Sequence, residues 1–287
     1  MTNPCHSGTM VSMNRLNFQK RAQILRCLVE GNSLRATSRI TGAAKNTVVK
    51  LLVDLGQACA EYQNLVMRNL TCRRIQCDEI WSFCYAKEKN VPEDKRGRFG
   101  YGDVWTWTAI CADTKLVPAW LVGPRDGTTA KIFIDDLASR LRHRVQLTTD
   151  GFKAYLEAVE DIFGADIDYA MLVKIYGLDP EVEKRYSPSK CIGAERVRVT
   201  GNPDRDYICT SFVERQNLTM RMSMRRFTRL TNAFSKKVEN LAHAVSIHFM
   251  YYNFGRIHQK LRVTPAMEAG ITDHVWELEE IISLLKD

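Results

Sequence analysis

The sequence lacks the features that would place it in a membrane or in an oxidising compartment. No apolar run reaches the roughly 18 residues that a membrane-spanning helix needs. Residues 1–13 have no apolar core of the kind found in signal peptides. The nine cysteines are odd in number and form no CxxC pair, which disfavours both a disulfide framework and a zinc site. We therefore expect a cytoplasmic protein with reduced, mostly buried thiols and no membrane partner.

Charge of one sign is in excess. The 287 residues include 41 Lys and Arg against 33 Asp and Glu, which gives a formal net charge of +8. Hydrophobic content of 45% and charged content of 26% are ordinary for a globular protein, and the length suits two domains. A basic excess favours a polyanionic partner, and nucleic acid is the first candidate.

Residues 13–68 have the pattern of a helix-turn-helix domain. Apolar residues recur at helical spacing over 17–30, and Ser33 can cap a short second helix. A turn at 41–42 then precedes a third helix over 44–55. We expect the preceding residues, 1–12, to be a disordered tail.

The start of the third predicted helix carries side chains that can reach phosphates and base edges. The candidate DNA contacts there are Lys45, Asn46, Thr47 and Lys50. Residues 13–56 hold eight basic side chains against two acidic ones, which agrees with a DNA-binding role. A plain three-helix bundle with a solvated basic face is the alternative interpretation.

Residues 70–255 have the element order of a ribonuclease-H-like domain. Residue alternation and periodicity predict strands over 73–85, 104–112 and 116–122, a helix over 128–143, a strand over 145–149, a helix over 152–163, a strand over 170–176, and helices over 211–230 and 237–252. The polar segment 177–210, broken by proline and glycine, is expected to be an insertion or loop. Residues 256–287 are expected to be a tail with a short helix. The predicted fold class is α/β, a mixed sheet with flanking helices, preceded by an all-α helix-turn-helix domain.

Three carboxylates lie where metal chemistry would need them. Asp78 lies in the first strand, Asp150 at the end of the fourth, and Glu214 in the first turn of the following helix. Because the first and fourth strands are neighbours in a ribonuclease-H-like sheet, these side chains can converge. Such oxygen ligands suit two Mg²⁺ or Mn²⁺ ions, which can activate an attacking oxygen and stabilise a leaving one. Glu79 competes with Asp78, but strand alternation sends the two to opposite faces, so only one of them is expected to point at the site.

The helix after Glu214 is strongly basic. Residues 215–237 contain seven basic residues and no acidic ones. At about 100° per residue, Asn217, Arg221 and Arg225 share one stripe with Glu214. Groups suited to phosphate would thus lie beside the metal ligand. The candidate DNA contacts of this segment are Asn217, Arg221, Arg225, Arg226, Lys236 and Lys237. A solvated basic helix is the alternative.

The sequence contains five stretches that bear on its family: DEIWSF at 78–83, TTDGFKAY at 148–155, FVERQNLTMRMSMRRFTRLTNAFSKK at 212–237 and YYNFGRIHQKLRVTPAMEAG at 251–270, with TGAAKNTVVKLL upstream. In these stretches the chain resembles the transposases of the insertion sequence 1 family, within the DDE transposase and retroviral integrase superfamily. The resemblance implies that Asp78, Asp150 and Glu214 are a catalytic triad. It also implies that Arg221, seven residues after Glu214, is the basic residue that the superfamily places there to touch DNA.

The sequence therefore predicts a transposase that binds the terminal repeats of an insertion sequence and cuts and rejoins DNA. Its partners would be the element ends and the target DNA, and a homodimer or larger assembly is expected because two ends must be processed. A domesticated transposase that only binds DNA is the alternative. A ribonuclease-H-like nuclease without joining activity is a third possibility.

Overall fold

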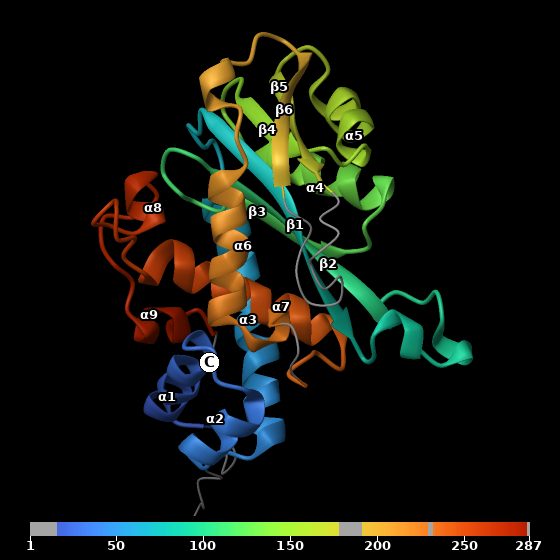
Figure 1. Ribbon diagram of the computed structural model, residues 1–287. Coiled ribbons are helices and arrows are strands. Elements are labelled where there is room, and N and C mark those ends of the chain that lie inside the picture. Colours follow the sequence, from blue (N-terminus) through green and yellow to red (C-terminus); the bar gives the residue numbers. More distant parts are fainter. Residues whose placement is uncertain (1–15, 178–190, 229–231, 286–287) are drawn as a thin grey trace, which may run out of the picture.

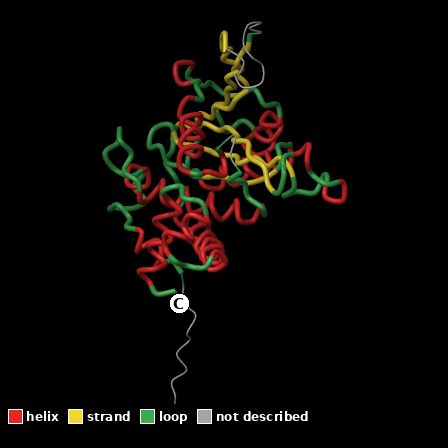
Figure 2. Tube along the Cα trace, turned by 60° about the horizontal axis from the view of Figure 1, so that its bottom comes forward, coloured by secondary structure: helices red, strands yellow, loops and turns green. Residues whose placement is uncertain are grey.

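The computed structural model describes residues 16–177, 191–228 and 232–285, and the tail expected at 1–12 lies outside them. The chain forms a sheet with helices on both of its faces and a group of helices at one end (Figures 1 and 2). The elements are α1 Phe18–Val29, α2 Leu34–Thr41, α3 Lys45–Val66, β1 Arg74–Cys84, β2 Gly102–Cys111, β3 Ala119–Gly123, α4 Gly127–Arg140, β4 Gln146–Asp150, α5 Ala154–Phe163, β5 Asp168–Tyr176, β6 Cys191–Thr200, α6 Ser211–Ser223, α7 Val238–Met250, α8 Pro265–Glu268 and α9 Leu278–Ser283. None of the described helices is both long and apolar enough to cross a membrane.

The six strands form one mixed sheet in the order β3-β2-β1-β4-β5-β6. β1 pairs antiparallel with β2 and parallel with β4, so the predicted neighbourhood of the first and fourth strands is confirmed. The sixth strand differs from the expectation. Residues 191–200, within the segment expected to be a loop, pair antiparallel with β5. Residues 178–190 of that segment lie outside the described residues.

Alternation along the strands assigns each helix to one face of the sheet. Trp107 lies opposite Glu79 in the β1–β2 register and packs against Phe133 of α4 and Tyr155 of α5. On the opposite face of the sheet, the ring of Trp120 of β3 packs against Phe249 of α7. The helices α4 and α5 therefore cover the face of Glu79, while α7 covers the opposite face.

The first two N-terminal helices begin and end close to where the sequence predicts, and the third begins there. The Ser33 hydroxyl accepts a hydrogen bond from the Ala36 N–H at 3.1 Å, which caps α2 as expected. Gly42 ends α2 with a φ of 70°, a conformation that glycine adopts without strain. The third helix is longer than predicted and continues from Leu55 to Val66.

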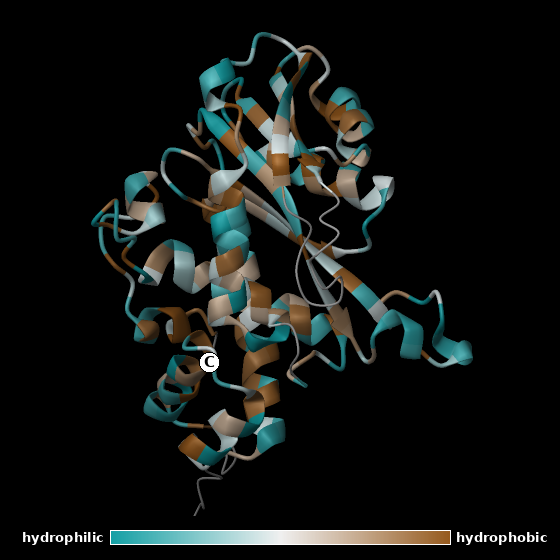
Figure 3. Cartoon of the chain, in the orientation of Figure 1, coloured by the Kyte–Doolittle hydropathy of each residue, from teal (hydrophilic) through white to brown (hydrophobic). Residues whose placement is uncertain are grey.

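The extension of α3 exists because it packs against α7. Gly56 lies so close to α7 that an added Cβ would be 2.5 Å from the Cβ of His243. The Ser246 hydroxyl donates to the Gly56 carbonyl at 2.7 Å, and the Gln63 side chain donates to the Ser246 carbonyl at 3.2 Å. In Figure 3 hydrophobic residues are frequent on α3, and the strands carry both hydrophobic and hydrophilic residues. Leu52, Leu55 and Cys59 of α3 belong to the same hydrophobic core as the sheet, so the N-terminal helices are fixed to the rest of the chain.

Two C-terminal segments also depart from the expectations. The helix predicted over 211–230 ends at Ser223, and Met224 is extended, with a φ of −132°. This break allows Met224 and Phe227 both to enter the core. The segment 256–287 is packed on the protein through its described part, since Trp276 contacts the rings of Tyr62 and Phe254.

Candidate active site

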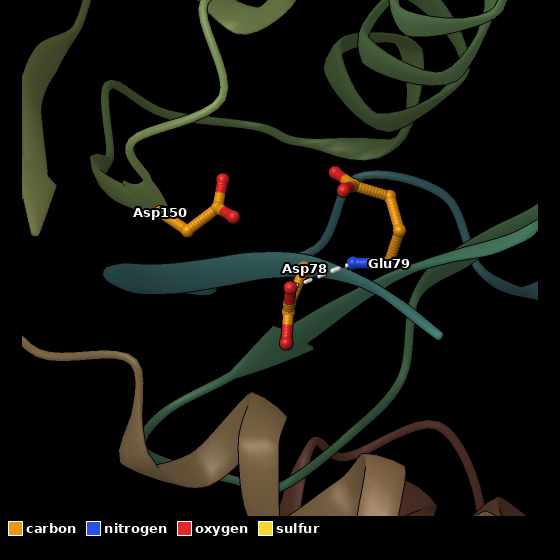
Figure 4. Close-up of side chains that lie close together, drawn as sticks. All are labelled: Asp78, Glu79 and Asp150. Carbon is orange, nitrogen blue, oxygen red and sulfur yellow. Dashed lines mark hydrogen bonds between the residues drawn. The ribbon is translucent and has the colours of Figure 1, made fainter. Parts of the chain in front are cut away.

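Strand β1 presents two adjacent carboxylates to opposite faces of the sheet. Figure 4 shows Asp78 and Glu79 leaving the strand in opposite directions. Two residues before Asp78, the Gln76 side chain accepts hydrogen bonds from the N–H groups of Phe212 at 2.9 Å and Val213 at 3.2 Å. The start of α6 is thereby held against the face to which Asp78 belongs. The expected alternation of Asp78 and Glu79 is confirmed, but the expectation that only one of them reaches the site is wrong, because a Glu79 oxygen also lies in the carboxylate cluster.

Asp150 reaches the same place from β4. Cys77 lies opposite Thr149 in the parallel β1–β4 register, so the next residues of the two strands are Asp78 and Asp150. Carboxylate oxygens of Asp78, Glu79 and Asp150 all lie within 4.8 Å of one another (Figure 4). The Phe152 N–H donates to Asp150 at 2.9 Å and orients its carboxylate.

Asp78 is the most enclosed member of the predicted triad. One of its oxygens accepts a hydrogen bond from the Glu79 N–H at 2.9 Å, and the other accepts one from the Asn217 side chain at 2.8 Å. Burial raises the pKa of Asp78 to about 7, and the negative charges of Glu79, Asp150 and Glu214 contribute to the rise. A bound cation would counter each of these effects.

Glu214 lies in the first turn of α6, outside the cluster of three carboxylates but close enough to affect the pKa of Asp78. Its Oε1 forms an ion pair with Lys174 Nζ of β5 at 2.6 Å and also accepts a hydrogen bond from the Thr210 hydroxyl. Burial lowers the pKa of Lys174, but the contact with Glu214 outweighs it and leaves that pKa above its ordinary value. Lys174 thus occupies one side of Glu214 as a competing cation.

Arg125 is the cation beside Asp150, as Lys174 is beside Glu214. Its Nε donates to the buried Glu79 carboxylate at 3.0 Å, and its guanidinium lies 3.7 Å from Asp150. The guanidinium also lies over the ring of Phe152, 4.0 Å from the centroid, and over Trp105 at 4.9 Å. Burial raises the pKa of Glu79, and Tyr155 and Arg125 oppose that rise.

The sequence interpretation missed Arg125 and Lys174. Each is a single basic residue among many, and no local spacing connects it to the carboxylates. Strand pairing brings them together: Lys174 is on β5, which reaches β1 through β4, and Arg125 follows β3, which reaches β1 through β2.

The donor set fits divalent metal ions of the hard kind. Four carboxylates, at Asp78, Glu79, Asp150 and Glu214, surround the site, and two cations, Arg125 and Lys174, lie among them. Oxygen ligands of this type are preferred by Mg²⁺ and Mn²⁺. The excess of acidic groups would favour binding of such cations.

Six of the predicted DNA contacts gather at one cavity although two separate parts of the sequence supply them. Lys45 and Asn46 come from the start of α3, while Arg225, Arg226, Lys236 and Lys237 follow α6. The cavity has a volume of about 610 Å³. The structure thus brings together residues about 180 positions apart. Arg226 is half-buried and donates to the Ser235 hydroxyl at 2.5 Å, which holds its own segment in place.

The remaining predicted DNA contacts lie elsewhere. Thr47 and Lys50 are on α3 but do not line the cavity. Asn217 is buried against Asp78, so its side chain orients the carboxylate. Arg221 lies on α6 two turns after Glu214, as its spacing predicts, but in the last turn of the helix, because α6 ends at Ser223. Arg225 does not continue the helical stripe, because α6 ends at Ser223.

No family model matches the chain, and no curated protein does. Among solved structures, the piggyBac transposase synaptic complex with hairpin DNA aligns over 98% of this chain and 74% of that chain, at 10% identity and a TM-score of 0.43. The Mos1 strand transfer complex aligns over 56% of this chain and 60% of that chain, at 13% identity and a TM-score of 0.24. These neighbours are transposases, and a likeness this distant assigns the chain to none of their families.

Proposed function

We propose that the chain is a DDE-type transposase that cuts DNA at the ends of an insertion sequence and joins them to a target. The observation that carries this proposal is the convergence of carboxylates from β1, β4 and the first turn of α6 around Asp78. In the proposal, Asp78, Asp150 and Glu214 hold two Mg²⁺ or Mn²⁺ ions. Bound there, the ions would activate the attacking oxygen and stabilise the leaving oxygen of a phosphodiester.

The chain's own residues would position these ligands. Asn217 holds one oxygen of Asp78, and the Phe152 N–H holds one oxygen of Asp150. Fixed ligands lose little freedom when they bind a cation, which favours both affinity and geometry. Arg125 remains beside Asp150, where its guanidinium can attract a DNA phosphate.

Recognition of the element ends is assigned to the N-terminal helices, with Lys45, Asn46, Thr47 and Lys50 as the DNA contacts. All four lie in the first two turns of α3, and Lys45, Asn46 and Lys50 are exposed. A homodimer or larger assembly on DNA belongs to the same proposal, since two ends must be cut and joined together.

The test uses the full chain and a plasmid that carries the gene with its flanking DNA. Asp78→Asn, Asp150→Asn and Glu214→Gln should each abolish Mg²⁺-dependent strand cleavage and joining while DNA binding stays near that of the wild type. Glu160→Gln, an exposed carboxylate of α5, is the matched control and should cleave normally. Wild-type activity in any of the three variants removes that residue from the site.

The products of the same assay distinguish the alternatives. Cleavage without any joined product would indicate a nuclease. DNA binding without cleavage under any divalent ion would indicate a protein that only binds DNA. Cleavage that persists in EDTA would contradict the metal-dependent mechanism.

A further inference from the structure

The cavity between the N-terminal helices and the segment after α6 has two basic walls. Arg35 of α2 and Lys45 of α3 line one wall, while Arg225, Lys236 and Lys237 line the other. All five side chains belong to exposed residues. Within the described part of the chain, none of the five forms an ion pair, and no acidic residue lines the cavity.

The walls are held at a fixed separation. Gly31, in the turn between α1 and α2, meets the end of α6 so closely that an added Cβ would lie 2.8 Å from the Ser223 carbonyl oxygen. A second close contact, between Gly56 of α3 and α7, also fixes the N-terminal helices to the rest of the chain. His248 at the cavity lining is neutral, because burial lowers its pKa to about 3. The positive charge of the cavity therefore comes from its exposed cations and from the half-buried Arg226.

Such an arrangement suits a polyanion with regularly spaced charges. Unpaired cations on a rigid surface gain free energy from a phosphate backbone through release of its counterions, and they need not be reorganised to bind it. The lining also includes the amide side chains of Asn32, Asn46, Asn232 and Asn240, which can donate to phosphate oxygens.

The cavity is also connected to the carboxylates. The helix α6 begins at the turn that carries Glu214 and ends at Ser223 in the cavity lining (Figure 1). Its 13 residues span about 20 Å at 1.5 Å per residue, which is less than one turn of a B-form duplex, about 34 Å. A strand that leaves the carboxylates along α6 would meet the basic walls directly.

We propose that this cavity binds the backbone of the duplex whose strand is cut at Asp78, Asp150 and Glu214, so that both walls act on one DNA. The inference rests on the proposed function, because it takes DNA as the substrate of the carboxylates. It adds that the N-terminal helices and residues 225–226 and 232–237 form one DNA-binding surface. Arg35, which the sequence interpretation did not select, belongs to that surface.

The experiment measures binding of the full chain to a fluorescent mixed-sequence DNA duplex over a range of salt concentrations. Lys45→Gln and Lys237→Gln each remove one charge, from opposite walls. Each should lower the slope of log Kobs against log salt by about 0.9, and the double variant by about twice that. Lys89→Gln is the matched control, since Lys89 is exposed on the loop between β1 and β2. If Lys45→Gln and Lys237→Gln show the same salt slope as Lys89→Gln, the inference is overturned.

A competition experiment tests the nature of the ligand. Unlabelled DNA should displace the probe from the wild type far better than polyglutamate at the same charge concentration. Equal competition would overturn the assignment to DNA. The two proposals can fail separately. If the wild type cleaves DNA with a metal ion and the salt dependence of DNA binding is unchanged in Lys45→Gln and Lys237→Gln, only the proposed function is supported. If these two variants lower the salt dependence but the wild type never cleaves DNA, only the DNA-binding surface is supported.

Discussion

The two ends of α6 lie beside opposite kinds of charge: acidic groups that have partners at its start, and basic groups without ion-pair partners in the described residues beyond its end. Near its first turn each acidic group has a partner: Asn217 for Asp78, Lys174 for Glu214, and Arg125 for Glu79. Beyond its last turn Arg225, Lys236 and Lys237 are exposed and form no ion pair with a described residue. Charges that must hold a metal geometry need fixed partners, whereas charges that attract a polyanion work best unpaired.

The helix itself suits this division. The positive end of its dipole favours the Glu214 carboxylate, and the negative end favours Arg221 in its last turn. The contact of Gly31 with Ser223 then joins the basic end to the N-terminal helices. Three experiments test this difference between the ends. One disturbs the contact between Gly31 and Ser223, one removes Lys174 from Glu214, and one varies the protonation of Asp78.

The largest effect is expected from Gly31→Ala. An added Cβ would lie 2.8 Å from the backbone oxygen of Ser223, so either α6 or the turn must move. Gly42→Ala is the matched control, because Gly42 has a φ of 70° against 76° for Gly31 and has no atom within 4 Å of an added Cβ. Overpacking should destabilise Gly31→Ala by about 1–3 kcal/mol more than the control.

Urea denaturation of both variants measures the difference. Both share the cost of placing alanine at positive φ, so that cost cancels. Equal free energies of unfolding would show that the contact between the turn and α6 is soft, and that the two ends of the helix are not rigidly joined.

A smaller effect is expected from Lys174→Gln. Because Lys174 forms an ion pair with Glu214, its removal frees a carboxylate for a metal ion. The affinity for Mn²⁺ in the absence of DNA should rise about tenfold, which corresponds to ~1.4 kcal/mol. Lys153→Gln removes a charge from an exposed position three residues after Asp150 and serves as the control. Isothermal titration calorimetry gives both affinities, and a gain no larger than the control's would show that Lys174 does not compete with the metal.

A third prediction concerns pH. The pKa of Asp78 is raised from 3.8 to about 7 in the folded, metal-free chain, so the folded state binds this proton more tightly than the unfolded state does. The stabilisation from this proton is present at low pH and is lost as pH rises from about 4 to about 7. Metal binding needs the deprotonated carboxylate, so Mn²⁺ affinity should rise over the same interval and level off above it.

Calorimetry in buffers of different ionisation enthalpy counts the protons released on Mn²⁺ binding. Release should be greatest below about pH 7 and should fall in Asp78→Asn. An affinity that does not change with pH across this interval would show that another group controls the site.

Local patterns were sufficient for most of the secondary structure. Alternation over 73–85 predicted β1, and the carboxyl side chains of Asp78 and Glu79 do lie on opposite sides. The Ser33 cap and the turn at Gly42 mark the limits of α2 as predicted. These features depend on residues within one or two turns of each other, which is the range over which a sequence pattern operates.

The sequence by itself determined which carboxylates the strands would carry and where the basic segments lie, because element type and charge are local properties. Only the tertiary structure decided how they meet. Packing against α7 carries α3 on to Val66, and burial of Met224 and Phe227 ends α6 at Ser223. Strand pairing selects Arg125 and Lys174 as the cations at the carboxylates. Each of these outcomes depends on contacts between residues far apart in the chain, and no local spacing encodes such contacts.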